Sequence, residues 1–129
     1  MIEKKILIII PTYNEGLIIG KILSELKETF INADILVIDG YSSDTTFDEV
    51  KKYNVNIIQV DKKFGISLAI ETGMLFAYKK KYDLLVRIDG DGQHSPSDAK
   101  KLLDFAIINN SDLTIGSRFL SKSEYSPNN

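Results

Sequence analysis

Two hydrophobic periodicities alternate along the chain, and this alternation restricts the possible folds more than any other feature. Short runs rich in β-branched and aliphatic residues are separated by stretches whose apolar residues recur every three or four positions. The strand-like runs occupy residues 6–10, 35–38, 56–60, 84–88 and 113–115. Parallel strands need long crossovers, so the pattern predicts an α/β fold, a mostly parallel sheet with helices on both faces. For the first four strands we expect the order 3-2-1-4.

The segments between these runs carry helical signals. From Ile19 to Phe30 the apolar residues follow i, i+3, i+4, i+7 spacing, and shorter faces of the same kind lie at 69–76 and 99–106. A weaker helix is expected at 45–53. Ser95 and Pro96 are typical of a helix start, because serine suits the N-cap and proline the first helical position. Asp98 stands in capping-box position behind them.

Length and composition limit the classes of protein. With 129 residues the chain forms one domain, and we expect residues 1–120 to fold together and 121–129 to be a polar tail. The net charge of -2 argues against a nucleic-acid partner, and the absence of cysteine excludes disulfides and thiolate metal sites. The longest apolar run, residues 6–10, is too short to span a membrane. We therefore expect a cytoplasmic protein or one at the cytoplasmic face of a membrane.

Polar residues follow every predicted strand, and ligands of open parallel sheets bind beyond the carboxyl ends of the strands. In chain order they are Tyr13, Asn14 and Glu15; Asp39, Ser42, Ser43 and Asp44; Asp61, Lys62 and Lys63; Asp89 and Asp91; Ser117 and Arg118. These side chains predict a site at one rim of the sheet. Several also have purely structural interpretations: the acids could cap helices, and His94 could serve as a hydrogen-bonding group.

The sequence RIDGDGQHSP places Asp89 and Asp91 one residue apart, between Gly90 and Gly92. Two like charges so close together favour a bound cation. Mg²⁺ and Mn²⁺ prefer carboxylate oxygens, and Mg²⁺ usually takes only one or two from protein, which leaves positions for water and phosphates. The pair therefore indicates a metal-bridged diphosphate site.

Other interpretations of the pair fail. An EF-hand loop starting at Asp89 would need glycine at its sixth position and glutamate at its twelfth, where the chain has His94 and Lys100. In phosphatases with an aspartyl nucleophile, the D-x-D usually follows the first strand, whereas here it follows the fourth. Neither G-x-x-x-x-G-K-[ST] nor G-x-G-x-x-G is present.

Five segments in order carry a family resemblance: IIIPTYNE, VIDGYSSDTT, GISLAIETG, DGDGQHSP and GSRF, from Ile8 to Phe119. The chain resembles the nucleotide-binding half of a family 2 glycosyltransferase with the GT-A fold. The form D-x-D-x-Q-H-x-P is most similar to the branch that makes polyprenyl-phosphate sugars, such as dolichol-phosphate mannose synthases.

The resemblance implies a set of nucleotide contacts. Pro11, Tyr13 and Glu15 would hold the base and ribose of a UDP- or GDP-sugar, and Asp39 would bind the base or the ribose. The family usually reads D-D-G-S-S-D after the second strand, but here Gly40 takes the second place, so a carboxylate is missing. The resemblance therefore leaves the identity of the base open.

The resemblance also implies a metal and phosphate site. Asp89 and Gly90 would lie near the ribose and the metal, while Asp91, with Gln93, would hold Mg²⁺ or Mn²⁺ on the diphosphate. Arg118 matches the arginine of the G-S-R motif that meets the phosphates. Asp91 and Arg118 would thus stabilise the leaving group, an electrostatic form of catalysis.

The expected function is transfer of the sugar, with inversion, to a lipid phosphate or a saccharide. The family supplies its general base from a region after G-S-R, and this chain ends eleven residues beyond Arg118. A lipid phosphate, largely ionised near pH 7, needs no base. The alternative is a nucleotide-binding remnant or subunit without the acceptor half. Because the acceptor half of the family normally covers the far side of the metal site, we expect the D-x-D loop of this chain to be open and mobile without ligand. Apolar surface near Phe119 and Leu120 could then favour a homo-oligomer.

Overall fold

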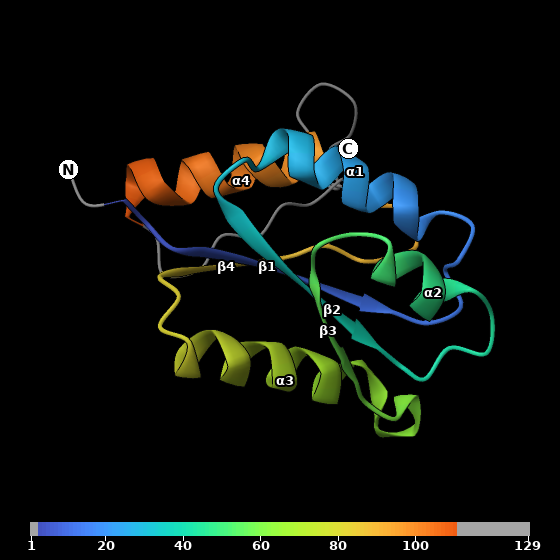
Figure 1. The fold of residues 1–129 in the computed structure, drawn as a ribbon. Helices are drawn as coiled ribbons and strands as arrows, with labels where there is room; N and C mark the ends of the chain where they lie inside the picture. The colour runs from blue at the N-terminus through green and yellow to red at the C-terminus, as the bar shows by residue number, and fades with distance from the viewer. Residues whose placement is uncertain (1–2, 111–129) are drawn as a thin grey trace, which may run out of the picture.

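The computed structural model describes residues 3–110 and contains a parallel sheet in the order β3-β2-β1-β4 (Figure 1). The strands are β1 (Ile6–Thr12), β2 (Ala33–Asp39), β3 (Asn56–Gln59) and β4 (Leu84–Arg87). Both the α/β class and the predicted strand order are confirmed. The predicted strand at 113–115 lies outside the described residues.

Helices cover both faces of the sheet, as predicted. They are α1 (Ile19–Thr29), α2 (Thr46–Lys51), α3 (Gly65–Lys79) and α4 (Pro96–Asn109), with a short 3-10 turn, η1 (Lys62–Phe64). In Figure 1, α1 and α4 lie over one face and α3 over the other. The second helix is shorter than the predicted 45–53. Ser95 caps α4 by accepting a hydrogen bond from the Asp98 backbone, which confirms the start inferred from the sequence.

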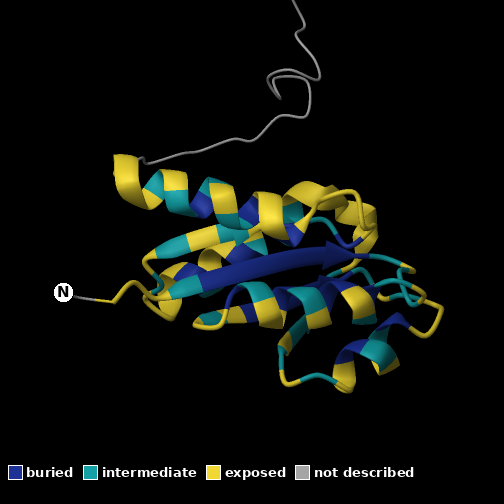
Figure 2. Ribbon diagram, turned by 90° about the horizontal axis from the view of Figure 1, so that it is seen from above, coloured by how far each residue is buried: buried dark blue, intermediate teal, exposed yellow. Residues whose placement is uncertain are grey.

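The apolar core has two layers because β1 is buried on both faces. Ile8 and Ile10 pack in the layer under α1 and α4, whereas Leu7 and Ile9 pack in the layer under α3. All four side chains are fully buried, and the central strand is the darkest element of Figure 2. Burial on both faces explains why this strand is a continuous apolar run without polar alternation.

Strand β1 extends two residues beyond its predicted end at Ile10. Pro11 pairs with Ile38, and Thr12 pairs with Asp39. Proline has no N–H to contribute, but its carbonyl oxygen still accepts a hydrogen bond, from Gly90. The continued pairing brings the first strand to the same level as Asp39, so both strands reach the rim where the polar residues gather.

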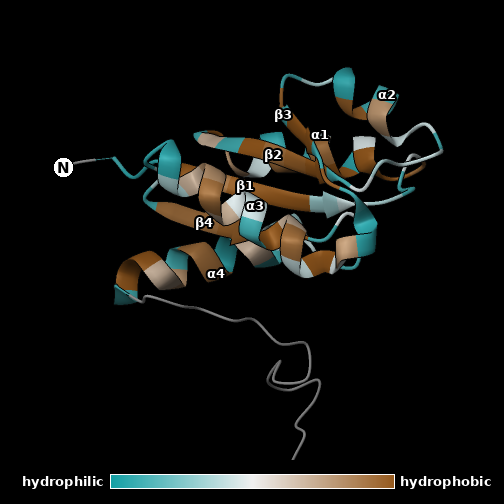
Figure 3. Ribbon diagram, turned by 90° about the horizontal axis from the view of Figure 1, so that it is seen from below, coloured by the Kyte–Doolittle hydropathy of each residue, from teal (hydrophilic) through white to brown (hydrophobic). Residues whose placement is uncertain are grey.

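The outer surface of α3 carries exposed apolar side chains, including Met74, Leu75 and Tyr78. Figure 3 shows the hydropathy of α3 and of β4, the strand at one edge of the sheet. Within residues 3–110, no helix has the length and apolar character needed to cross a membrane.

Candidate functional site

Asn14 joins the loops that follow β1 and β2. Its Oδ1 accepts hydrogen bonds from the backbone N–H groups of Ser43, at 2.8 Å, and Asp44, at 3.3 Å. Its own N–H donates to the Ser42 hydroxyl at 2.8 Å. Asn14 adopts a left-handed φ of 51°, which asparagine tolerates better than most residues. This side chain therefore fixes the rim at the ends of the two central strands.

Asp39 is fully buried at the end of β2, and both of its oxygens accept hydrogen bonds from the protein. Oδ1 accepts from the hydroxyls of Thr12 and Ser42, and Oδ2 accepts from the Ser42 N–H and the Gln59 amide. Buried carboxylates are stable only with such partners. In this arrangement Asp39 organises the loop around Ser42.

The D-x-D loop is seated directly on the end of β1. Gly90 is buried, and its N–H donates to the Pro11 carbonyl oxygen at 3.2 Å. A Cβ at this position would lie 2.5 Å from Thr12 Cγ2, closer than atoms can approach. Gly92 has a φ of 82°, the left-handed region that favours glycine. The glycines between and after the two aspartates are therefore required by packing and by the turn.

Asp89 is paired with two neighbouring side chains. Arg87 donates from Nε to Asp89 Oδ1 at 3.1 Å, and its Nη2 lies 3.0 Å from the same oxygen. The Asp89 N–H donates to Nδ1 of His94, whose Nε2 lies 3.7 Å from Oδ2. His94 thus has the structural role considered for it. The repulsion expected between the two aspartates is reduced, because Arg87 offsets the charge of Asp89.

Asp91 is exposed, and its Oδ1 accepts a hydrogen bond from the Gln93 N–H at 3.0 Å. The Gln93 side chain is exposed beside it. The charge of Asp91 acts on Glu15, in the loop between β1 and α1. Burial raises the pKa of the Glu15 carboxyl, and the negative charges of Asp91 and Asp44 raise it further. Carboxylates from separate loops therefore repel one another across the rim.

The Glu15 backbone is held by a contact that the sequence did not reveal. Its N–H donates to the Thr46 hydroxyl at 2.8 Å, from the first turn of α2. Asp44 accepts hydrogen bonds from the Thr46 hydroxyl and from the Thr46 and Gly16 N–H groups. The bond from the Thr46 hydroxyl contributes most to lowering the pKa of the Asp44 carboxyl, and the two N–H groups lower it further. The loop that leads into α1 is therefore fixed to the start of α2.

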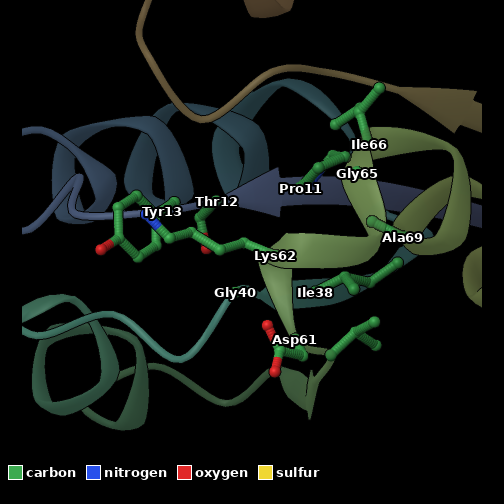
Figure 4. A pocket seen from close by; sticks show the side chains of 11 residues that line it. Pro11, Thr12, Tyr13, Ile38, Gly40, Asp61, Lys62, Gly65, Ile66 and Ala69 are labelled. Atoms are coloured by element: carbon green, nitrogen blue, oxygen red, sulfur yellow. The ribbon is translucent and has the colours of Figure 1, made fainter.

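A pocket opens beside the end of β1, between the loops after β2 and β3 (Figure 4). Its polar lining includes Thr12, Tyr13, Asp61 and Lys62, and its remaining lining is Pro11, Ile38, Gly40, Val60, Gly65, Ile66 and Ala69. Pro11 and Thr12 line this pocket and also contact Gly90. One strand end therefore supports both the pocket and the D-x-D loop.

The donor set at the rim fits a divalent cation that is shared with a ligand. Among residues 3–110 no three acidic or histidine side chains stand close enough to form a complete metal cage. Mg²⁺ typically uses one or two protein carboxylates together with substrate phosphates, so a cage is not required. Asp91 supplies an exposed carboxylate, and a cation near it would offset the negative charge that raises the pKa of Glu15.

Comparison with known proteins identifies the family and the fold of the chain. The family model described as Glycosyl transferase family 2 matches residues 7–129. The chain belongs to glycosyl transferase family 2. A mannosyltransferase of Pyrobaculum calidifontis, solved in complex with GDP-Man and Mn²⁺, superimposes with a TM-score of 0.68 at 19% identity. The match covers 81% of this chain and 33% of that protein. The fold is therefore the GT-A fold of this family.

Several similar proteins carry functional names, and two of them illustrate the range. An undecaprenyl-phosphate mannosyltransferase of Micrococcus luteus is 34% identical over 88% of this chain and 48% of its own length. A UDP-N-acetylglucosamine--dolichyl-phosphate N-acetylglucosaminyltransferase of Methanococcus voltae is 30% identical over 97% of this chain and 56% of its own length. This family 2 chain thus spans about half the length of the curated relatives it matches.

The structure brings together most of the site residues expected from the family 2 resemblance. Pro11 and Tyr13 line the pocket. Glu15 and Asp91 interact electrostatically. The hydrogen bond from Gly90 to Pro11 connects the D-x-D loop with the pocket. Arg118 lies outside the described residues, so its phosphate contact stays a prediction. The pairing of Arg87 with Asp89 was missed, although an arginine two residues before an aspartate is a local signal of such a contact.

Proposed function

We propose that this chain is the nucleotide-sugar-binding half of a metal-dependent glycosyltransferase that inverts the anomeric centre of the transferred sugar. The observation that carries the proposal is the seating of Gly90 on Pro11. This contact places the exposed carboxylate loop beside a pocket lined by Pro11 and Tyr13. A base held in the pocket would then direct its diphosphate toward Asp91.

The nucleoside would occupy the pocket and the rim around it. Tyr13 offers an aromatic side chain and Pro11 an apolar surface for the base. Glu15, in the loop before α1, lies within reach of the Asp91 charge. Asp39 would contribute mainly by holding Ser42 and Thr12 in place, since both of its oxygens already accept hydrogen bonds.

Asp91, supported by Gln93, would hold Mg²⁺ or Mn²⁺, with Asp89 beside it. A divalent cation there supplies positive charge to the diphosphate leaving group. The chain itself contributes positioning: Gly90 fixes the loop on β1, and Arg87 with His94 orients Asp89. Arg118 is expected to donate to the phosphate oxygens and to add to this preorganised stabilisation.

The acceptor is proposed to be a polyprenyl phosphate. The relatives from Micrococcus luteus and Methanococcus voltae are named for transfer to undecaprenyl phosphate and dolichyl phosphate. A phosphate monoester is largely ionised at pH 7, so its oxygen can attack without a general base. Such an acceptor would place the reaction at a membrane surface. A saccharide acceptor would instead require a base to take its proton.

A nucleotide-binding remnant without transfer activity is the second candidate. It is favoured by Gly40, which stands where a carboxylate is common in the family. Incubation with a nucleotide sugar and vesicles that contain polyprenyl phosphate separates the two. Transfer of labelled sugar into lipid supports the enzyme, whereas binding without transfer supports the remnant.

The direct test is thermal unfolding with UDP, GDP and ADP, each with and without Mn²⁺. At ligand concentrations a hundredfold above Kd, the free energy of unfolding should rise by about 2.7 kcal/mol. We expect this gain for at least one nucleotide, and only when Mn²⁺ is present. If no nucleotide stabilises the chain in either condition, the proposed function is wrong.

A further inference from the structure

We propose that Lys62, held over the ring of Tyr13 and facing Gly40, selects a base with an edge rich in carbonyl oxygens, so that the pocket prefers uridine over guanosine diphosphates. This inference rests on the proposed function, because it names the base within the same pocket. Lys62, Tyr13 and Gly40 all line that pocket (Figure 4).

Lys62 is positioned by the turn after β3. Its Nζ lies 3.8 Å from the centroid of the Tyr13 ring, a favourable cation–π distance. The proximity of Lys62 lowers the pKa of the Tyr13 phenol, which agrees with an ammonium group beside the ring. The Asp61 side chain accepts a hydrogen bond from the Lys63 N–H at 2.9 Å and so fixes the turn that presents Lys62.

Gly40 provides the space for this arrangement. A Cβ at position 40 would lie 3.0 Å from the Lys62 Cβ and 3.4 Å from Tyr13 Cδ1. Any larger side chain would therefore press against both residues. Gly40 therefore has two consequences. It allows the Lys62 side chain to lie over the Tyr13 ring, and it leaves this wall of the pocket without a carboxylate.

The other carboxylates near the pocket are engaged by the protein. Asp39 accepts hydrogen bonds on both oxygens. Asp61, which lines the pocket, accepts from the Lys63 backbone on Oδ1, and its Oδ2 lies 3.7 Å from the Lys63 ammonium. In the described part of the pocket, the cation of Lys62 is thus the charged group best placed to meet a base.

An ammonium group donates hydrogen bonds and cannot accept them. The pairing edge of uracil presents two carbonyl oxygens around one N–H, whereas that of guanine presents one carbonyl beside two donor groups. A donor that is left without an acceptor when the base binds lowers the affinity of the pocket for that base, by about tenfold for each such donor. The pocket should therefore bind UDP about tenfold more tightly than GDP.

Titration calorimetry of UDP and GDP in the presence of Mn²⁺ tests the inference. The variant Lys62→Met removes the cation and keeps the length of an exposed side chain. Lys79→Met is the matched control, because Lys79 is an exposed lysine at the end of α3 that does not line the pocket. We expect about a tenfold preference for UDP in the wild type and in Lys79→Met. In Lys62→Met the two affinities should agree within about twofold. Melting temperatures near that of the wild type would show that both variants are folded.

A second variant, Gly40→Asp, places an acceptor against Lys62 and should lower the preference for UDP in the same assay. Tighter GDP than UDP binding by the wild type, or an unchanged preference in Lys62→Met, overturns the inference and leaves the proposed function standing. If neither nucleotide binds the wild type with Mn²⁺, both the proposed function and the inference are wrong.

Discussion

The N–H of Gly90 lies 3.2 Å from the carbonyl oxygen of Pro11, and this single hydrogen bond attaches the D-x-D loop to the central strand of the sheet. Pro11 is buried and also lines the pocket beside Tyr13. The two halves of the candidate site are therefore set by one strand end, so a change at Gly90 should disturb both nucleotide binding and stability.

The variant Gly90→Ala should destabilise the chain by about 1–3 kcal/mol, because its Cβ would overlap Thr12 Cγ2 and crowd the Pro11 carbonyl. Urea unfolding of the ligand-free protein measures this change.

The companion variant Thr12→Ser removes Cγ2 and keeps the hydroxyl that donates to Asp39. In the Thr12→Ser background, Gly90→Ala should cost less than in the wild type. An equal cost in both backgrounds would show that the overlap with Thr12 is not what requires glycine.

The variant Glu15→Gln should stabilise the empty protein near pH 7 by about 0.5 kcal/mol, since the Glu15 side chain is only partly buried and its repulsion is screened. Burial and the charges of Asp91 and Asp44 raise the pKa of Glu15, so the folded state disfavours its ionised form. The contribution of Glu15 to the free energy of unfolding of the wild type therefore falls as the pH rises above the ordinary glutamate pKa of about 4.3.

Melting curves of the wild type and Glu15→Gln across pH 4 to 8 follow this effect. The difference between the two proteins should be smallest at the acid end and grow through the window above about pH 4.3. A difference that is constant over this range would mean that the charge of Glu15 is not responsible.

The variant Asn14→Ala should cost about 2 kcal/mol, because it removes acceptors for the Ser43 and Asp44 N–H groups and places alanine at a φ of 51°. Asn14→Gly loses the same hydrogen bonds but adopts this backbone easily, so it should cost about 1 kcal/mol less than alanine. Denaturant midpoints of the two variants give the comparison. If alanine is tolerated as well as glycine, the left-handed backbone at this position is not retained.

The arrangement of strands was predictable because it depends on local pattern. The apolar runs before Pro11 and Asp39 and the periodic segment from Ile19 identified strands and helices directly. The location of the candidate site was also predictable, because parallel strands end at the same edge of the sheet and polar residues follow each strand in the sequence. The end of β1 was placed two residues too early, because a proline is normally a reason to end a strand.

The contacts within the site were not predictable, because each depends on residues far apart in the chain. Nothing local to Glu15 indicates that Thr46 accepts its N–H, and nothing near Lys62 indicates that it lies over Tyr13. The sequence suggested that Asp39 binds a ligand, whereas its four protein donors become visible only when the loops are assembled.

The central claim is that Asp91 holds a divalent cation on a nucleotide diphosphate, and melting curves of Asp91→Asn, empty and loaded, test it most directly. The matched control is Asp104→Asn, which removes a partly exposed carboxylate paired with Lys100 on α4. Empty Asp91→Asn should be as stable as the wild type or slightly more stable, because repulsion with Glu15 is lost. With the nucleotide and Mn²⁺ at a hundredfold above the wild-type Kd, the wild type and Asp104→Asn should gain about 2.7 kcal/mol and Asp91→Asn far less. A destabilised empty Asp91→Asn with an undiminished ligand-induced gain would contradict the account.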